Sequence, residues 1–267
     1  MLHLLKIDLK KLTSYRTFWV VCGLYFITLG FTTASGMEFL KWLANKSVEF
    51  GANININRIP LYHFPDIWQN VIFVSGFFKL ILAFMVVISV TNEFTYRTIR
   101  QNIIDGMSRT EFLLSKMLTN VLLSLLSCAM LLIIILVTGF IYSPEIIWSD
   151  IFTDAGFMFA YFLEMFSFLS YTLMLGLLIQ RSGLTIVVLC LSHMLEAIVK
   201  ANIDDVAPGL IPFFPMESIT NLVEMPFARY AFQEIQDYVS LTSVAIALGW
   251  LIIFNYISYL KLQKSDL

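Results

Sequence analysis

The chain of 267 residues is too apolar and too poor in charge for an ordinary soluble domain, because 58% of its residues are hydrophobic and only 13% are charged. Soluble domains carry about a quarter charged residues, so the composition indicates an integral membrane protein. The net charge of −2 says little, since the charges are sorted by position. The three cysteines lie inside apolar runs, where they are typical of small buried hydrophobes and not of disulfides or metal ligands: Cys22, Cys128 and Cys190.

Residues 1–16 alternate apolar and basic positions, which predicts a helix lying in the membrane interface. It is interpreted either as an elbow helix or only as a basic flank of the first span. Residues 17–36 form an apolar run of about the length that a bilayer requires. A signal peptide is the alternative, but Thr32–Ser35 make a poor cleavage site, so an uncleaved anchor is expected.

The next segments are a first external loop at 37–69 and a second span at about 67–90. Three aromatic residues of the loop suit a membrane interface: Trp42, Tyr62 and Trp68. The loop is a contact site for cargo or an accessory protein, or simply an anchor in lipid. Lys79 lies inside the second span, where its long stem lets it snorkel toward the outer head groups; the alternative is a pore-lining role.

Residues 92–116 form a long polar segment between two strongly apolar runs. Residues 93–105 predict a short helix, and Gly106 is a plausible stop. Ser108 and Glu111 have the spacing of a capping box, which predicts a new helix leading into the third span. Two interpretations stay open, a compact surface on which a partner docks and an ordinary charged cytoplasmic loop.

Three further spans are expected at about 113–142, 155–179 and 184–199. Residues 200–237 then break the pattern with four of the seven prolines: Pro208, Pro212, Pro215 and Pro226. They predict short broken helices at the outer face, re-entrant if covered by protein or facing water. A sixth span follows at about 238–260. Basic residues gather in 1–16, 92–116 and the C-terminal segment, so both termini and the 92–116 segment are expected in the cytoplasm.

Besides Lys79, four polar residues fall inside the predicted spans or directly at the end of one. Glu164 costs roughly 2.5–3.5 kcal/mol at mid-bilayer, so it is expected to line a translocation path or to hydrogen-bond to Ser or Thr on a neighbouring span. His193, Glu196 and Lys200 share one helix face, with Glu196 and Lys200 in a favourable i, i+4 order. One His and one Glu are too few ligands for zinc, so no metal site is expected. Two interpretations of these three residues stay open. They form a polar patch whose members pair with one another, or they take part in cargo passage or inter-subunit contact.

The 92–116 segment resembles the first cytoplasmic loop of type-2 ABC exporter permeases. The match covers about a tenth of the chain closely, and the hydropathy profile agrees with it along the rest. Arg97 departs from the pattern, because a small residue such as Gly is expected there. The matching positions are Glu93, Phe94, Thr98, Arg100, Ile103, Gly106, Ser108, Arg109, Phe112 or Leu113, and Lys116.

The resemblance implies an all-α polytopic permease, one domain over residues 1–267, with six spans, an elbow helix at 1–16 and a re-entrant element within 200–237. Residues 92–116, Arg97 included, would be the coupling helix on a separate P-loop ATPase present in two copies. ATP and Mg would sit in that partner, since the chain has no P-loop motif. A second permease copy or a related permease, membrane lipid and an accessory protein are the other expected partners, without nucleic acid.

The expected location is the bacterial inner membrane, the direction is export, and the chain has no catalytic residue. The translocation-path candidates are Lys79, Glu164, His193, Glu196 and Lys200. Two rival classes use part of that set. One is a protease-like intramembrane enzyme that would use Glu164, His193 and Glu196. The lack of a second histidine inside the predicted spans argues against it. The other is a proton-coupled transporter that would use Glu164. Many such transporters are built from internal repeats, and the absence of a recognisable repeat in this sequence argues against that class.

Overall fold

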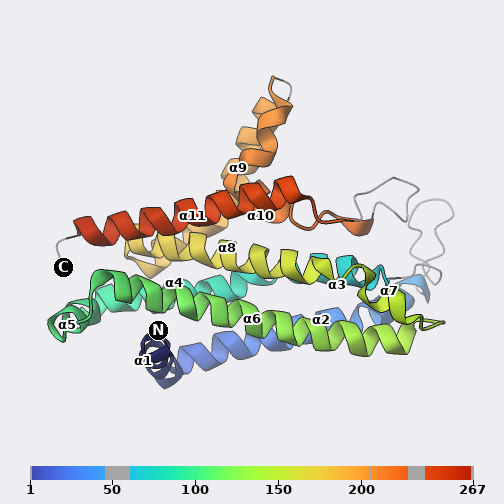
Figure 1. Cartoon of the computed structure of the whole chain (residues 1–267), viewed down its shortest axis with the longest axis horizontal. Coiled ribbons are helices and arrows are strands. Elements are labelled where there is room, and N and C mark those ends of the chain that lie inside the picture. The colour runs from blue at the N-terminus through green and yellow to red at the C-terminus, as the bar shows by residue number, and fades with distance from the viewer. Residues whose placement is uncertain (1, 46–60, 205, 228–237, 266–267) are drawn as a thin grey trace.

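Figure 1 shows the computed structural model, an elongated bundle of helices in which the described residues form no strand. The structure describes residues 2–45, 61–204, 206–227 and 238–265. The helices in chain order are α1 (Leu2–Ser14), α2 (Arg16–Asn45), α3 (Ile67–Gly76), α4 (Lys79–Thr95), α5 (Thr98–Ile104), α6 (Arg109–Tyr142), α7 (Trp148–Thr153), α8 (Gly156–Ile179), α9 (Ser182–Ile203), the 3-10 helix η2 (Pro208–Phe213), α10 (Pro215–Thr220) and α11 (Leu241–Lys264).

Helix α8 forms the centre of the bundle, with α11 along one side and α4 and α6 along the other (Figure 1). Its sequence is apolar around the whole circumference, as expected of a helix covered on all sides. Tyr161, Phe168 and Leu173 are fully buried there. Helix α9 has a different environment, because few of its residues are buried and much of it projects away from the bundle.

Five helices are long and apolar enough to cross a membrane: α2, α6, α8, α9 and α11. The pair α3 and α4 passes the same test together but is bent by 42°, so it adds a sixth span only if it crosses as one unit. The chain is therefore a multi-pass membrane protein. The span expected at about 67–90 therefore contains a break after Gly76, which the sequence does not predict. Ser75 and Gly76 precede the break, and Ser/Gly pairs are a common cause of sharp helix kinks.

Several predicted boundaries differ from the observed ones. The single helix expected at 93–105 is divided, because α4 continues to Thr95 and α5 begins only at Thr98. The fifth helix runs to Ile203, beyond the expected end at 199, and the last one begins at Leu241 instead of 238. In the 200–237 segment, η2 and α10 are the short helices that the prolines predict, while 205 and 228–237 lie outside the described residues.

Two of the three aromatic residues expected to anchor the first external loop in the membrane interface are described by the structure, and both are buried. Trp68 is 2% exposed, and its indole Nε1 donates to the carbonyl of Ile151 at 2.8 Å. Tyr62 is also buried and donates to the carbonyl of Thr33. Both side chains fix the packing of the bundle instead of lying at its surface. The side chain of Trp42 and residues 46–60 lie outside the described part.

Candidate functional site

The 92–116 segment folds as a helix end, a break, a short helix and a new helix start. Arg97 takes the left-handed backbone conformation, with φ 55°, between α4 and α5. Glycine adopts that conformation most readily. Position 97, where the resemblance leads us to expect a small residue such as glycine, is therefore one where the backbone favours glycine. Gly106 ends the short helix with φ 98°, as its predicted role as a stop requires.

The capping box at the start of α6 is confirmed. The backbone N–H of Ser108 donates to Glu111 Oε2 at 2.8 Å, and the backbone N–H of Glu111 donates to Ser108 Oγ at 3.2 Å. Two backbone donors that the helix cannot satisfy are thus paired with side chains. The turn between α5 and α6 therefore has a defined geometry.

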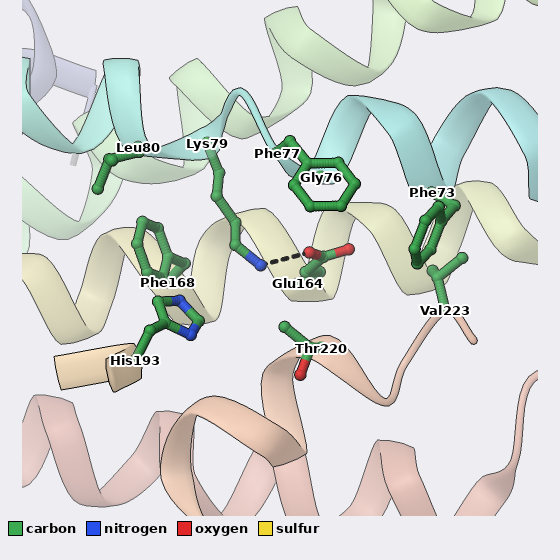
Figure 2. A pocket seen from close by; sticks show the side chains of 10 residues that line it. All are labelled: Phe73, Gly76, Phe77, Lys79, Leu80, Glu164, Phe168, His193, Thr220 and Val223. Atoms are coloured by element: carbon green, nitrogen blue, oxygen red, sulfur yellow. Dashed lines mark hydrogen bonds and ion pairs between the residues drawn. The ribbon is translucent and has the colours of Figure 1, made fainter. Parts of the chain in front are cut away.

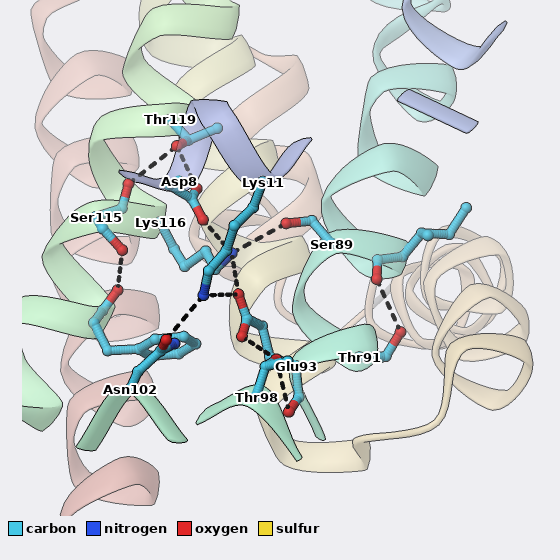
Figure 3. A network of polar contacts seen from close by, with 12 residues as sticks. Asp8, Lys11, Ser89, Thr91, Glu93, Thr98, Asn102, Ser115, Lys116 and Thr119 are labelled. Atoms are coloured by element: carbon cyan, nitrogen blue, oxygen red, sulfur yellow. Dashed lines mark hydrogen bonds and ion pairs between the residues drawn. The ribbon is translucent and has the colours of Figure 1, made fainter. Parts of the chain in front are cut away.

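Beneath this turn lies a group of three buried charges and one half-buried one, Lys11, which we name the charge cluster: Asp8, Lys11, Glu93 and Lys116 (Figure 3). Lys116 Nζ donates to Asp8 Oδ1 at 2.5 Å, to Glu93 Oε1 at 3.2 Å and to Ser89 Oγ at 3.2 Å. The side chains of Lys116, Asp8 and Glu93 are at most 7% exposed. A buried charge needs a partner of opposite sign, and here one ammonium serves two carboxylates.

Uncharged groups complete the charge cluster and join four helices. Thr119 Oγ1 donates to Asp8 Oδ2 at 2.6 Å, and Thr98 Oγ1 donates to Glu93 Oε2 at 2.5 Å. Lys11 Nζ lies 3.5 Å from Glu93 Oε1 and donates to Asn102 Oδ1 at 3.0 Å. Helices α1, α4, α5 and α6 are thereby held to one another at one end of the bundle (Figures 1 and 3).

Sequence reasoning missed Asp8, although a signal was present. Asp8 lies three residues after Leu5 and four before Leu12, so it shares the apolar face of a helix whose other charges are basic. An acidic residue on that face indicates a buried cation opposite it. That cation is Lys116, which the sequence alone indicates only as a position of the docking loop.

The residues predicted for the docking loop divide between interior and surface. Glu93 and Lys116 are buried, whereas Phe94 and Ile103 are half-buried and pack against the core. Among the exposed side chains of the outer surface are two large apolar or aromatic ones and two arginines, which we name the loop face: Tyr96, Arg97, Arg100 and Ile104. Tyr96 is 65% exposed and Ile104 78%. Large apolar side chains beside two arginines are a composition typical of protein interfaces.

Arg109 is neither buried nor part of the loop face. Its guanidinium Nη1 donates to the carbonyls of Leu262 at 3.0 Å and Gln263 at 2.6 Å. It therefore binds the last turn of α11, where helix carbonyls lack partners and attract cations. The start of α6 and the end of α11 are joined by this side chain.

A second polar site lies inside the bundle, in a pocket of about 340 Å³ bounded by α3, α4, α8, α9 and α10. Figure 2 shows Lys79 reaching from the start of α4 to Glu164 on α8, with Nζ and Oε1 2.6 Å apart. The snorkelling expected of Lys79 is wrong, because its ammonium points into the bundle and the residue is 7% exposed. Glu164 is satisfied by this ammonium and not by the Ser or Thr partner that was one expectation.

Aromatic and polar side chains share the walls of this pocket. Lys79 Nζ lies 5.2 Å from the centroid of the Phe168 ring, a favourable distance for a cation over an aromatic face. A Cβ added at Gly76 would lie 2.9 Å from Glu164 Oε1, so a side chain at this position would crowd the carboxylate of Glu164. The lining residues are Phe73, Gly76, Phe77, Lys79, Leu80, Glu164, Phe168, His193, Thr220 and Val223.

Of the three polar residues predicted to share a face of α9, only His193 lines the pocket. Glu196 accepts hydrogen bonds from the backbone N–H groups of Met216 at 2.9 Å and Glu217 at 2.7 Å. Lys200 pairs with Glu217. The expected pairing of Glu196 with Lys200 is wrong, because a helix start provides two unpaired N–H donors that a carboxylate satisfies better. These two residues hold α10 against α9.

These observations define the class of the protein as a helical multi-pass membrane protein with a polar pocket between its helices. Within that class, the chain belongs to the family described as "Protein of unknown function (DUF2705)", whose model matches residues 21–267. A comparison with curated proteins found no match. In the described ranges, no group of three or more His, Cys, Asp or Glu side chains is placed to hold a metal ion.

Proposed function

We propose that the chain is the membrane-spanning permease subunit of an ATP-driven ABC exporter. The observation that carries the proposal is the loop face, an exposed surface on α5 and the two residues before it. The interior side of this segment is fixed by the charge cluster. A surface that transmits a force must be stiff, and buried ion pairs with satisfied hydrogen bonds provide stiffness. The resemblance of residues 92–116 to the coupling loop of type-2 exporter permeases supports the same assignment.

In this proposal, α3 and α4 cross the membrane as one bent span, which gives six spans with both termini in the cytoplasm. Helix α1 is the elbow helix, α5 is the coupling helix, and η2 and α10 are the re-entrant element. The ends of α1, α5 and α11 that this topology places together in the cytoplasm lie at the same end of the bundle (Figure 1). The membrane is the bacterial inner membrane.

Two copies of a P-loop ATPase would bind the loop faces of two permeases, either two copies of this chain or this chain and a related one. ATP and Mg would be bound by the ATPase, and this chain would supply no covalent chemistry. Movement of α5 would pass through Glu93 and Lys116 to α4, α6 and α1, because these residues join the four helices. Lys79, Glu164 and His193 would line the path, while Glu196 and Lys200 would position α10.

The test is a mild-detergent purification of the tagged full chain from its native membranes, followed by mass spectrometry. Wild type is compared with Arg100→Glu and with Ile104→Asp, two exposed changes that leave the charge cluster intact. The matched control is Arg181→Glu, an equal charge reversal at an exposed position in the turn between α8 and α9. All four proteins are first checked for equal helical content.

A P-loop ATPase that copurifies with wild type and with Arg181→Glu, but not with the two loop-face variants, supports the proposal. Loss of an exposed interface anchor commonly costs more than about 1 kcal/mol of binding, which is several-fold in affinity. If no ATPase is recovered with wild type after cross-linking in membranes, the permease assignment is refuted. Equal recovery with all four proteins refutes the loop face as the docking surface.

A further inference from the structure

The pocket around Lys79 and Glu164 has a feature that says more about its ligand than a general place on a translocation path does. It places a buried ammonium and a buried carboxylate side by side at the wall of a cavity, among helices that cross the membrane (Figure 2). Its volume of about 340 Å³ lies within the range of known small-ligand sites. An ion pair that served packing alone would not need an open space of that size beside it.

The charges of the pocket restrict what can enter it. Lys79 and Glu164 are oppositely charged and 2.6 Å apart, so with a neutral His193 the lining is neutral overall. A ligand with one charge could pair with only one of the two residues and would leave the other charge buried without its partner, which is strongly unfavourable. A ligand with both charges could pair with both residues and add no net charge.

Each charge of such a ligand meets a suitable partner. A cationic group can replace Lys79 Nζ beside Glu164 and the Phe168 ring, where an ammonium is already accommodated at 5.2 Å from the ring centroid. An anionic group can accept from Lys79 once that ammonium is released. His193 lines the same pocket beside Phe168, with 6.2 Å between the ring centroids, and hydrogen-bonds to no residue that the structure describes. It offers a further N–H donor.

The rest of the lining suits an apolar chain attached to that head group. Phe73, Phe77, Leu80 and Val223 supply an apolar wall beside the polar side chains of the pocket, which are Lys79, Glu164, His193 and Thr220. Phe77 is 71% exposed, so the apolar wall continues onto the outside of the bundle. That outside is in contact with lipid wherever the helices cross the membrane.

We propose that this pocket is a binding site for a zwitterionic amphiphile, whose ammonium pairs with Glu164, whose phosphate or carboxylate pairs with Lys79 and His193, and whose apolar chain lies against the phenylalanines. Binding opens one internal ion pair and forms two with the ligand. The inference does not depend on an ATPase partner, because it concerns equilibrium binding to the isolated chain. Its failure and the failure of the permease assignment are therefore seen in different experiments.

The test uses four probes that share a dodecyl chain and differ only in the head group. They are dodecylphosphocholine, dodecyl phosphate, dodecyltrimethylammonium and the uncharged dodecyl maltoside, which also forms the micelle. Binding of the first three to the purified full chain is measured by native mass spectrometry and by calorimetric titration at low mole fraction. The expected result is one saturable site for the zwitterion, with binding at least ~10-fold tighter than for either singly charged probe.

Two variants and a control locate the site. Lys79→Met combined with Glu164→Gln removes both charges together, so no unpaired charge is left to unfold the protein, and the preference for the zwitterion is expected to disappear. His193→Phe keeps the ring contact with Phe168 and is expected to weaken the binding of the zwitterion several-fold. The control is Thr138→Ala, which removes a hydrogen bond to the carbonyl of Ile134 within α6, a helix that contributes no lining residue to the pocket, and it should leave binding unchanged.

Three results overturn the inference. One is equal affinity of wild type for all charged probes, which would indicate unspecific partition into the micelle. Another is tightest binding of dodecyl phosphate or of dodecyltrimethylammonium, which would indicate a site for a single charge. The last is an undiminished preference for dodecylphosphocholine in the Lys79→Met, Glu164→Gln double variant, since the site would then lie elsewhere in the chain.

Discussion

Lys116→Met tests whether the charge cluster is the element that holds the loop face in place. Methionine keeps most of the apolar stem of lysine and removes the ammonium. Asp8 and Glu93 then face each other without the cation that lies 2.5 Å from one carboxylate and 3.2 Å from the other. The comparison variant is Lys11→Met, which removes a cation from the edge of the same cluster.

The expected magnitudes follow from burial. Loss of one partner from a buried ion pair destabilises a protein by about 3–5 kcal/mol. Thr119 and Thr98 still donate to the two carboxylates, so we expect the lower end, about 3 kcal/mol. The side chain of Lys11 is 33% exposed and lies 3.5 Å from Glu93. Solvent screens that interaction, so Lys11→Met should cost about 0–1 kcal/mol.

The assay is equilibrium unfolding of the purified chain in maltoside micelles, followed by circular dichroism. Adding Asp8→Asn to Lys116→Met should restore part of the lost stability, because Asp8 is the carboxylate that loses its cation, whereas Glu93 keeps Lys11 at 3.5 Å. The reasoning is refuted if Lys116→Met loses no more stability than Lys11→Met. It is equally refuted if Asp8→Asn makes the Lys116→Met protein less stable still.

Two other substitutions test the geometry of the short helices. Glu196→Gln keeps one acceptor but loses the charge that receives two backbone N–H groups of α10, so we expect about 1–3 kcal/mol of destabilisation. Hydrogen exchange should then accelerate at Met216 and Glu217, and unchanged protection there would contradict the assignment. Gly106→Ala places a Cβ at φ 98° and should cost about 1–2 kcal/mol. Gly183→Ala, at a glycine with open space and without positive φ, should be nearly neutral in the same unfolding assay.

The local features of the docking segment were predictable from the sequence because each depends on residues close together in the chain. The capping box joins Ser108 to a residue three positions away, and the stop at Gly106 needs only its own backbone. The break at Tyr96 and Arg97 was missed, since helical periodicity continues across it and nothing local forbids an arginine from completing a helix. The left-handed conformation of Arg97 turns the chain between the two helices, so that α5 packs against α4.

The partners of the charged residues were not predictable in the same way. Rules that consider one helix at a time favour the outer head groups for Lys79, with a pore-lining role as the alternative, and favour Lys200 as the partner of Glu196. The observed partners lie on other helices, with Lys79 and Glu164 separated by 85 positions and Glu196 and Met216 by 20. Asp8 was overlooked for the same reason, because its partner Lys116 is 108 positions away.

The sequence alone determined that the chain is a helical membrane protein, where most of its long helices lie, and which segment forms the polar turn between α4 and α6. Hydrophobic run length and capping spacing are local properties, and the chain carries them wherever the helices are placed. Only the tertiary structure decided which buried charges meet, which loop residues face outward and that a pocket opens beside Lys79 and Glu164. Those outcomes depend on the rotation and register of one helix against another, which the packing of the whole bundle sets.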